Sequence, residues 1–572
     1  MQSPLFLLAL LLLAGVTPAT AATAEPPADL IFYGRHILPM AADKPTGQRG
    51  LRAVAVRGER IVYVGRADRL RKEQAHLIGP DTEAIELGRQ ALLPGFIDAH
   101  GHLTFQAFTI DLANVAPPPV GPVSTIADLQ DTLRSYIAER AVQPGDWISG
   151  NGYDDSLLAE GRHPTRRDLD AVSTEHPIAL MHISGHLMTA NSRALALAGI
   201  TADSADPQGG LIRRWPDSEE PNGVLEETAT YPLRPFLFGT QQNVMDNLRR
   251  ALELYASYGI TTIQDGATAP ESIELIRAAA DAGLLQQDVI FYPVQNAIAP
   301  IPEAWALGRY GKRAKAGGIK LVLDGSPQGK TAYLSAPYEV PPDGQDADYR
   351  GYPIHPPAKV SALVDHYLRL GVPILAHANG DAAAELLVNA VADTEHERDH
   401  RTVMIHAQTV REDQLQRMAE LGIIPSFFSA HTFFWGDWHR DSVLGLERAS
   451  RISPTATARR LGLNYTVHND APIVPPDMLR LLWATSSRIT RSGAVLGAAE
   501  RATVYDALLA ITRNAAAQAF EEADKGTLAV GKLADLVVLS RNPLRVPRKR
   551  LLELTIVSTW SHGRQIYGNV AE

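Results

Sequence analysis

The sequence predicts an α/β protein built on a (β/α)8 TIM barrel, with a small discontinuous β-sandwich domain and a lid inserted after the first barrel strand. Apolar runs of strand length alternate with helical stretches, which is typical of a parallel sheet covered by helices. The two ends of the chain share a hairpin-like pattern of short strands. About 160 residues separate the first two barrel strands, more than one strand–helix unit needs, and this predicts the insertion.

Eight barrel strands are expected, the number that closes this fold. The first leads into His100. The other seven are predicted at Ile260–Gln264, Val289–Val294, Ile319–Leu323, Val372–Ala376, Val403–Ile405, Ile423–Phe428 and Tyr465–Val467. A further strand-like run, Pro177–Ile183, is assigned to the insertion.

The predicted domains follow from these patterns. Residues 25–92 and 525–572 form the composite β-sandwich, and residues 93–524 form the barrel, with the lid at about 111–240. Residues 1–24 resemble a signal peptide, because the apolar run Leu5–Val16 precedes the small-residue cleavage site Ala22-Thr23-Ala24. We therefore expect export to the periplasm or the medium. No Lys or Arg precedes the apolar run, so a retained anchor is the alternative.

Composition and net charge limit the possible partners and the possible metal ligands. The net charge of -10 is spread along the chain, which argues against nucleic acid or a membrane surface as partner and favours a small neutral or weakly charged molecule. The chain has no cysteine, which excludes disulfides, thiolate ligands and a cysteine nucleophile. Any metal must be bound by nitrogen and oxygen.

Metal-ligand residue types stand near the ends of five predicted strands. His100 and His102 are expected on one side of an extended strand, where two imidazoles can bind one metal ion. Four further candidates follow at later strands: Lys320, His377, His406 and Asp470. Each alone has a structural explanation, such as a hydrogen-bonded histidine or a helix-capping aspartate. Because the carboxyl ends of barrel strands meet, the whole set predicts a metal site.

This order of residues resembles the amidohydrolase superfamily, and more narrowly the amidohydrolase 3 branch that includes N-substituted formamide deformylases. The shared motifs are Leu93-Pro94-Gly95-Phe96-Ile97-Asp98, Ser184-Gly185-His186, Gly223-Val224-Leu225-Glu226-Glu227, Asp324-Gly325-Ser326, His377-Ala378-Asn379-Gly380-Asp381 and Gly526 to Leu536. The similarity covers nearly the whole mature chain.

The resemblance implies one or two divalent metal ions, with zinc expected. It places His100 and His102 on the more buried metal, His377 and His406 on the more exposed one, and Lys320 between them as its carbon dioxide adduct. Asp470 would bind metal and transfer the proton. Ile405 stands where many relatives have Glu, which changes the surroundings of His406. Glu226 is a substitute bridge and a predicted substrate-binding residue, and His468 is a reserve ligand or a structural residue.

The predicted reaction is hydrolysis of an amide-type carbon–nitrogen bond, as in an N-acyl or N-formyl amine, by attack of metal-bound hydroxide. Asp470 would accept the proton and return it to the leaving nitrogen. His186 would hydrogen-bond the oxyanion or else only pack in the lid. The aromatic segment Phe427–Trp438 predicts substrate contacts from His431, Phe434 and Trp435, or else it holds its loop against the lid.

Two other functions stay open at this point. A deaminase of a heterocyclic amine uses a similar scaffold, although Lys320 argues against it. A catalytically silent binding protein would need no metal at all. For either enzyme the expected partner is a small amide-like or heterocyclic molecule, with no nucleic acid and no stable membrane association; a homo-oligomer is compatible with the sequence.

Overall fold

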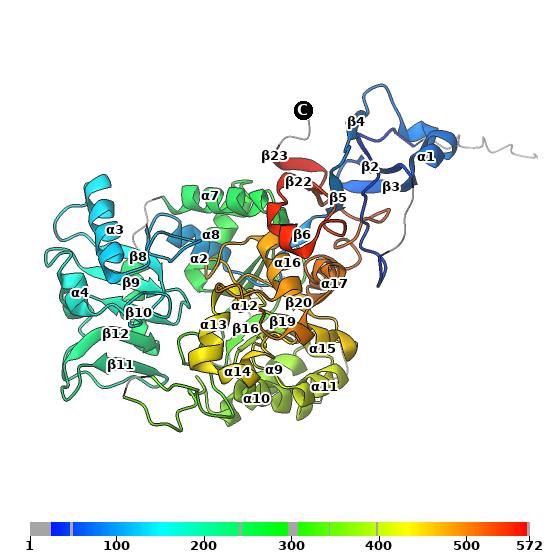
Figure 1. Ribbon diagram of the computed structural model, residues 1–572. Coiled ribbons are helices and arrows are strands. Elements are labelled where there is room, and N and C mark those ends of the chain that lie inside the picture. Colours follow the sequence, from blue (N-terminus) through cyan, green and yellow to red (C-terminus); the bar gives the residue numbers. More distant parts are fainter. Residues whose placement is uncertain are drawn as a thin grey trace, which may run out of the picture.

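The computed structural model describes residues 25–45, 50–238, 243–295, 307–342, 344–395 and 399–568 (Figure 1). The predicted signal peptide, residues 1–24, lies outside these ranges, so it stays a prediction. Among the described helices, none has the length and apolar character needed to cross a bilayer.

Two parallel sheets occupy the centre of the molecule. One contains β6 (Phe96–Ile97), β13 (Ile260–Thr268), β14 (Asp288–Pro293) and β15 (Ala314–Ala316). The other contains β16 (Ile319–Val322), β17 (Ile374–Ala378), β18 (Val403–His406), β19 (Ile424–Phe427) and β20 (Thr466–Val467). All neighbouring pairs are parallel. The predicted strands therefore form, in the predicted order, and the α/β class is confirmed.

Backbone contacts link the two sheets at both edges. A parallel bridge joins Val294 to Lys320 on one side. On the other, Asp470 N donates to His100 O at 3.2 Å and His102 N donates to Ala471 O at 2.8 Å. The predicted strand at Ile319 has a break before it, because Gly317 and Gly318 separate β15 from β16. A Cβ on Gly318 would lie 2.2 Å from Pro373 O, so only glycine fits there.

One detail of the prediction is wrong. Strand β6 ends at Ile97, so His100 and His102 lie beyond it and do not alternate within a strand. His102 is instead the residue before helix α2 (Leu103–Thr109). The two imidazoles still converge, with ring centroids 4.9 Å apart, because the chain turns between them.

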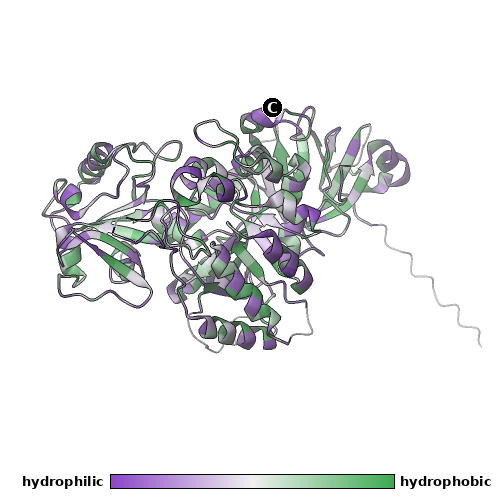
Figure 2. Ribbon diagram, turned by 60° about the horizontal axis from the view of Figure 1, so that its bottom comes forward, coloured by the Kyte–Doolittle hydropathy of each residue, from purple (hydrophilic) through white to green (hydrophobic). Residues whose placement is uncertain are grey.

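Helices cover the outside of the parallel strands (Figure 1). They include α7 (Val244–Ser257), α8 (Pro270–Asp281), α9 (Pro357–Arg369), α10 (Asp381–Ala392), α11 (Glu412–Leu421), α15 (Thr455–Arg460), α16 (Met478–Ser487), α17 (Val504–Ala510) and α18 (Arg513–Gln518). In α8, proline at the first position and buried Ile273, Ile276 and Ala280 at helical spacing explain both its start and its packing face. Figure 2 shows the hydrophobic residues along the strands and many hydrophilic ones over the helices.

The insertion forms a six-stranded sheet of its own. Its order is β11 (Gly210–Arg214), β12 (Pro221–Glu227), β10 (Leu187–Ala190), β9 (Ile178–His182), β8 (Ile148–Tyr153) and β7 (Ala113–Asn114). Helices α3 (Ile126–Glu139), α4 (Arg166–Asp170) and α5 (Ser192–Leu197) accompany it, and it lies beside the central strands (Figure 1). The run Pro177–Ile183 therefore belongs to this insertion, as predicted.

The two chain ends pack together. Strands β1 (Leu30–Gly34), β2 (Arg52–Arg57), β3 (Arg60–Arg66) and β4 (Glu83–Glu86) form one sheet, and β5 (Ala91–Pro94), β21 (Leu536–Leu539), β22 (Ile556–Ser561) and β23 (Arg564–Gly568) form another. Residues of both sheets share one hydrophobic core, in which the rings of Phe32 and Trp560 meet at 5.4 Å. The domain boundaries themselves stay a prediction.

Candidate metal centre

The six predicted metal ligands come together. His100, Lys320, His377, His406 and Asp470 are all buried, and His102 is half-buried. All of them except His100 line one cavity of about 580 Å³, whose remaining wall includes residues of the insertion. Side chains from five separate parts of the chain therefore face a common space.

Asp470 lies at the middle of this group. Its Oδ1 is 3.1 Å from His102 Nε2 and 3.5 Å from His100 Nε2, and its Oδ2 is 4.0 Å from His406 Nε2. Ligand atoms of His100, His406 and Asp470 all lie within 4.8 Å of one another. On the opposite side His377 Nδ1 is 3.1 Å from His406 Nε2.

The donor atoms fit a divalent cation. Asp470 Oδ1 is buried without a hydrogen bond in the described residues. Burial lowers the pKa of His100, His377 and His406 well below the ordinary value, so their imidazoles are neutral. Neutral imidazoles and a carboxylate are ligands that zinc and similar ions take.

Hydrogen bonds on the side away from the cavity determine which ring nitrogen of His100 and of His377 faces the other predicted ligands. His100 Nδ1 is 2.8 Å from Gln264 Oε1, and His377 Nε2 is 3.0 Å from Gly325 O. Both oxygens only accept, so these outer nitrogens carry the proton and the inner ones present a lone pair. Neither Gln264 nor Gly325 was predicted. The one available signal for Gln264 is its amide at the end of an apolar strand run.

His468 supports His406 from outside the centre. His468 Nε2 lies 3.1 Å from His406 Nδ1, and Ser426 Oγ lies 2.8 Å from His468 Nδ1. Burial lowers the pKa of His468 to about 3, so it stays neutral. Of its two predicted roles, this geometry favours the structural one.

Lys320 lies among the ligands without a carboxylate partner. Its Nζ is 3.1 Å from His100 Nε2, and no ion pair joins it to an acidic residue in the described ranges. Burial lowers the pKa of Lys320 to about 8, against the opposing effect of Asp470. A substantial fraction of the amine is therefore neutral near pH 8, the form that reacts with carbon dioxide.

The insertion brings His186 to the cavity wall. His186 Nδ1 is 2.8 Å from Glu227 Oε2, and its ring centroid is 5.1 Å from that of His377. Burial disfavours the imidazolium, but Glu227 outweighs burial and raises the pKa of His186. Since Nδ1 is bound to Glu227, Nε2 is the nitrogen left for a ligand.

A buried hydrogen-bonded chain holds the loop that carries His186. Asp155 Oδ1 accepts from His182 Nε2 at 2.9 Å, and His182 Nδ1 lies 2.8 Å from Ser184 Oγ. Ser184 Oγ in turn accepts the backbone N–H of His186 at 3.1 Å. These contacts fix the turn between β9 and β10, and they were not predicted.

Glu226 is not among the residues that line the cavity. Its carboxylate accepts from Arg213 Nε at 2.5 Å and from the Tyr352 hydroxyl at 3.3 Å. Side chains alternate along β12, so its neighbour Glu227 is the one that reaches His186. The substrate-binding role of Glu226 stays a prediction without support from its contacts.

The aromatic segment packs instead of lining this cavity. His431 and Phe434 lie in α12 (His431–Phe434), and the buried Trp435 follows it. Trp435 Nε1 donates to Asp154 Oδ2 of the insertion at 2.6 Å, and His431 Nδ1 is 2.9 Å from His439 Nε2. This favours the alternative that the segment holds its loop against the insertion. The aromatic rings that do line the cavity are Phe105, Phe108 and Tyr231.

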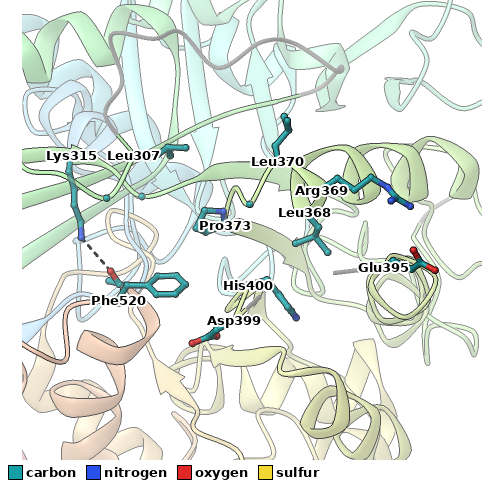
Figure 3. Close-up of a pocket in the computed structure, with 14 residues that line it drawn as sticks. Leu307, Lys315, Leu368, Arg369, Leu370, Pro373, Glu395, Asp399, His400 and Phe520 are labelled. Atoms are coloured by element: carbon teal, nitrogen blue, oxygen red, sulfur yellow. Dashed lines mark hydrogen bonds between the residues drawn. The ribbon is translucent and has the colours of Figure 1, made fainter. Parts of the chain in front are cut away.

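A second cavity, of about 860 Å³, lies beside β15 and at the amino ends of β16, β17 and β18 (Figure 3). Its polar wall includes Lys315, Asp399 and His400, and none of the predicted site residues line it. Lys315 pairs with Glu521 at 2.6 Å, and Asp399 pairs with Arg401 at 2.8 Å. The candidate site is therefore the smaller cavity, which the predicted metal ligands other than His100 line.

Comparison with known proteins gives consistent results. The model of the Amidohydrolase family matches residues 83–567. The N-substituted formamide deformylase of Arthrobacter pascens is 28% identical over 560 residues, which covers 94% of this chain and 97% of that protein. The putative amidohydrolase YtcJ of Bacillus subtilis (strain 168) is 26% identical over 556 residues, or 94% and 99% of the two chains. The crystal structure of an uncharacterized metal-dependent hydrolase from Pyrococcus horikoshii OT3 shares the fold, with a TM-score of 0.69, 22% identity and coverage of 91% and 99%.

Proposed function

This chain belongs to the amidohydrolase family, and from that premise we propose that it is a metal-dependent hydrolase of N-acyl or N-formyl amines. The family match confirms the resemblance inferred from the motifs. One observation supports the proposal most strongly: His102, His377, His406, Lys320 and Asp470 line one cavity, and His100 lies 3.5 Å from Asp470. The similarity to the deformylase supports an amide as the substrate, because the name of that relative describes cleavage of a substituted formamide.

The proposed cofactor is one or two divalent ions, with zinc expected. A bound divalent ion would lower the pKa of water and polarise the amide carbonyl. His100, His102, His377, His406 and Asp470 would hold it, and Lys320 would add a carboxylate-like ligand after reaction of its amine with carbon dioxide. The contact between Lys320 Nζ and His100 Nε2 supports that position. Lys320 also favours amide hydrolysis over the deaminase alternative.

Asp470 is the proposed proton carrier. Its carboxylate reaches three ligand histidines and lines the cavity, so it can accept a proton from the attacking water and deliver it to the leaving nitrogen. His186 Nε2 would donate a hydrogen bond to the oxygen that becomes negative, since Glu227 holds the ring and favours its protonated form.

Residues 1–24 support a proposal about location. An apolar run followed by a small-residue cleavage site is typical of exported proteins, so we expect the mature enzyme in the periplasm or the medium. Sequencing the amino terminus of the protein recovered from its native host tests this, and an intact Met1 would contradict it.

A substrate screen tests the reaction. Metal-loaded protein is incubated with N-formyl and N-acyl amines, and the released amine is measured by mass spectrometry. We expect amine release that a chelator abolishes and added metal restores. Ammonia release from heterocyclic amines, without cleavage of any amide, would support the deaminase instead.

A further inference from the structure

Arg234 places an unpaired positive charge in the wall of the candidate site. It opens α6 (Arg234–Phe238) and lines the same cavity as His377, His406 and Asp470. Its Nε is buried without a hydrogen bond, and no carboxylate of the described residues forms an ion pair with it. Burial lowers the pKa of Arg234, yet a guanidinium remains protonated in proteins. A partly buried cation without a carboxylate partner is costly unless a ligand supplies the partner.

Other partly buried arginines of the insertion each reach a carboxylate. Arg213 pairs with Glu226 at 2.5 Å, Arg166 with Glu220 at 2.9 Å, and Arg214 with Asp206 at 3.0 Å. These three partly buried arginines of the insertion thus each form an ion pair with a carboxylate, as expected for a structural role. Arg234 differs from them in facing the cavity and in having no anion.

Two nearby acidic residues do not neutralise Arg234. Glu227 acts on it electrostatically, but Oε2 of its carboxylate is bound to His186 at 2.8 Å, and neither of its oxygens forms an ion pair with Arg234 within the described ranges. Glu271 lines the same cavity from the first turn of α8, but it is exposed and forms no ion pair with Arg234 within the described ranges. Arg234 therefore faces the cavity without an ion-pair partner among the described residues, which leaves room for an anion from a ligand.

The layout also indicates where the anion would lie. His186 is next to the ligand His377, and Arg234 is close enough to His186 to affect its pKa. The Arg234 guanidinium lies 4.7 Å from the Tyr231 ring, and Phe105 and Phe108 add an apolar wall. A substrate with its amide at the metal ligands and a carboxylate farther out would contact all of these groups.

We propose that Arg234 is a specificity-determining residue that binds a carboxylate on the amine portion of the substrate. The inference rests on the proposed amide hydrolysis and narrows its substrates to carboxylate-bearing N-formyl or N-acyl amines with an apolar side chain. Arginine suits this role because its planar N–H groups match a carboxylate in two parallel hydrogen bonds. The amine portion is chosen because a formamide has only one carbon on its acyl side.

The test compares two substrates that differ only in the carboxylate: N-formylphenylalanine and N-formylphenethylamine. The metal-loaded wild type should prefer the acid. Arg234→Met should lower kcat/KM for the acid by about 10- to 100-fold, as expected for one charged contact, and change the neutral amide little. Arg234→Lys should retain part of the preference. Arg193→Met, the same change at an exposed residue of α5 in the insertion, is the matched control and should behave like wild type.

Several outcomes would overturn the inference. A wild type that treats both substrates alike, or an Arg234→Met variant that loses activity on both equally, removes Arg234 from substrate recognition. A stronger preference for the matching phosphonate would contradict the carboxylate assignment.

A binding measurement separates this inference from the proposed reaction. Isothermal titration of N-formylphenylalanine into metal-loaded protein is repeated with Arg234→Met. Binding that depends on Arg234 without any hydrolysis supports the carboxylate site and contradicts the proposed reaction. Hydrolysis of the neutral amide without binding of the acid supports the proposed reaction and contradicts the carboxylate site.

Discussion

At the scale of single residues, the sequence predicts the inner ligands better than their surroundings. His100, His377 and Asp470 could be recognised because chemistry-bearing residues at the ends of apolar strands converge in a barrel. Arg234 could not, because it follows an irregular segment whose path has no periodic signal. Glu226 shows a different limit, since the pattern Glu226-Glu227 does not reveal which carboxylate reaches His186.

Substitution of Asp470 tests its role as proton carrier. Asp470→Asn keeps an oxygen ligand but removes a basic carboxylate, so we expect most of the metal to remain and kcat to fall by about 10²- to 10⁴-fold. Metal content and kcat are measured on the same preparation. Asp441→Asn changes an exposed aspartate and should leave both unchanged. Undiminished turnover in Asp470→Asn would remove Asp470 from the mechanism.

His468 should matter for metal affinity without being a ligand. Because it lies 3.1 Å from His406 Nδ1, His468→Phe leaves that nitrogen without its partner, and we expect metal affinity to fall by about 10- to 100-fold. Competition with a fluorescent chelator measures this. His439→Phe, which alters another buried imidazole, is the control. Equal affinity of His468→Phe and wild type would exclude the supporting role.

At the scale of elements, hydrophobic periodicity predicts that a strand or helix exists, and its place in the chain order, more reliably than the residues at which it begins and ends. The strand predicted before His100 exists, but β6 ends at Ile97 because the chain then turns toward the site. The aromatic segment shows why composition alone does not decide a role. Its rings are compatible with both substrate binding and packing. The contact of Trp435 with Asp154, and a cavity lining that includes none of its rings, distinguish the two roles.

That contact predicts a stability effect. Trp435→Phe keeps an aromatic ring but leaves Oδ2 of the buried Asp154 without its donor, so the free energy of unfolding should fall by about 1–3 kcal/mol. KM should stay unchanged. Urea unfolding and steady-state kinetics check both, with Trp438→Phe, whose indole donates to Gln328 O, as the control. A raised KM at unchanged stability would mean that Trp435 contacts substrate.

At the scale of the whole molecule, a buried ion cluster joins the last segment of the chain to the central strands. Lys525 Nζ lies 2.6 Å from Asp288 Oδ2, at the start of β14, and His562 Nε2 lies 3.0 Å from the same oxygen. The similar strand patterns at the two ends predicted that they pack together. The cluster itself could not be predicted, because Asp288 and His562 are 274 residues apart in the sequence and no local pattern links them.

Asp288 should make the fold sensitive to acid. Burial favours its protonated form, but Lys525 and His562 outweigh burial and hold the pKa of Asp288 below its ordinary value. The carboxylate therefore stabilises the fold above the unfolded-state pKa of about 4, and this contribution is lost as pH falls through the lower folded-state value. We expect Tm to fall steeply in acid.

Asp288→Asn tests this contribution near neutral pH. It leaves the buried Lys525 with Glu521, 3.1 Å away, as its ion-pair partner, so the free energy of unfolding should fall by about 1–3 kcal/mol, and the acid dependence of Tm should flatten. Thermal unfolding from pH 3 to pH 7 measures both. Asp281→Asn, which removes an exposed ion pair with Lys312, should change little. A Tm profile of Asp288→Asn identical to wild type would contradict the stabilising role.

The central claim is that residues from distant parts of the chain hold a divalent metal together. Metal content of purified protein, measured by mass spectrometry after loading and gel filtration, tests it most directly. The wild type should retain one or two ions per chain, and a folded His100→Ala, His406→Ala double variant should retain far less. A wild type without bound metal, or a double variant that binds as much as the wild type, would contradict the account.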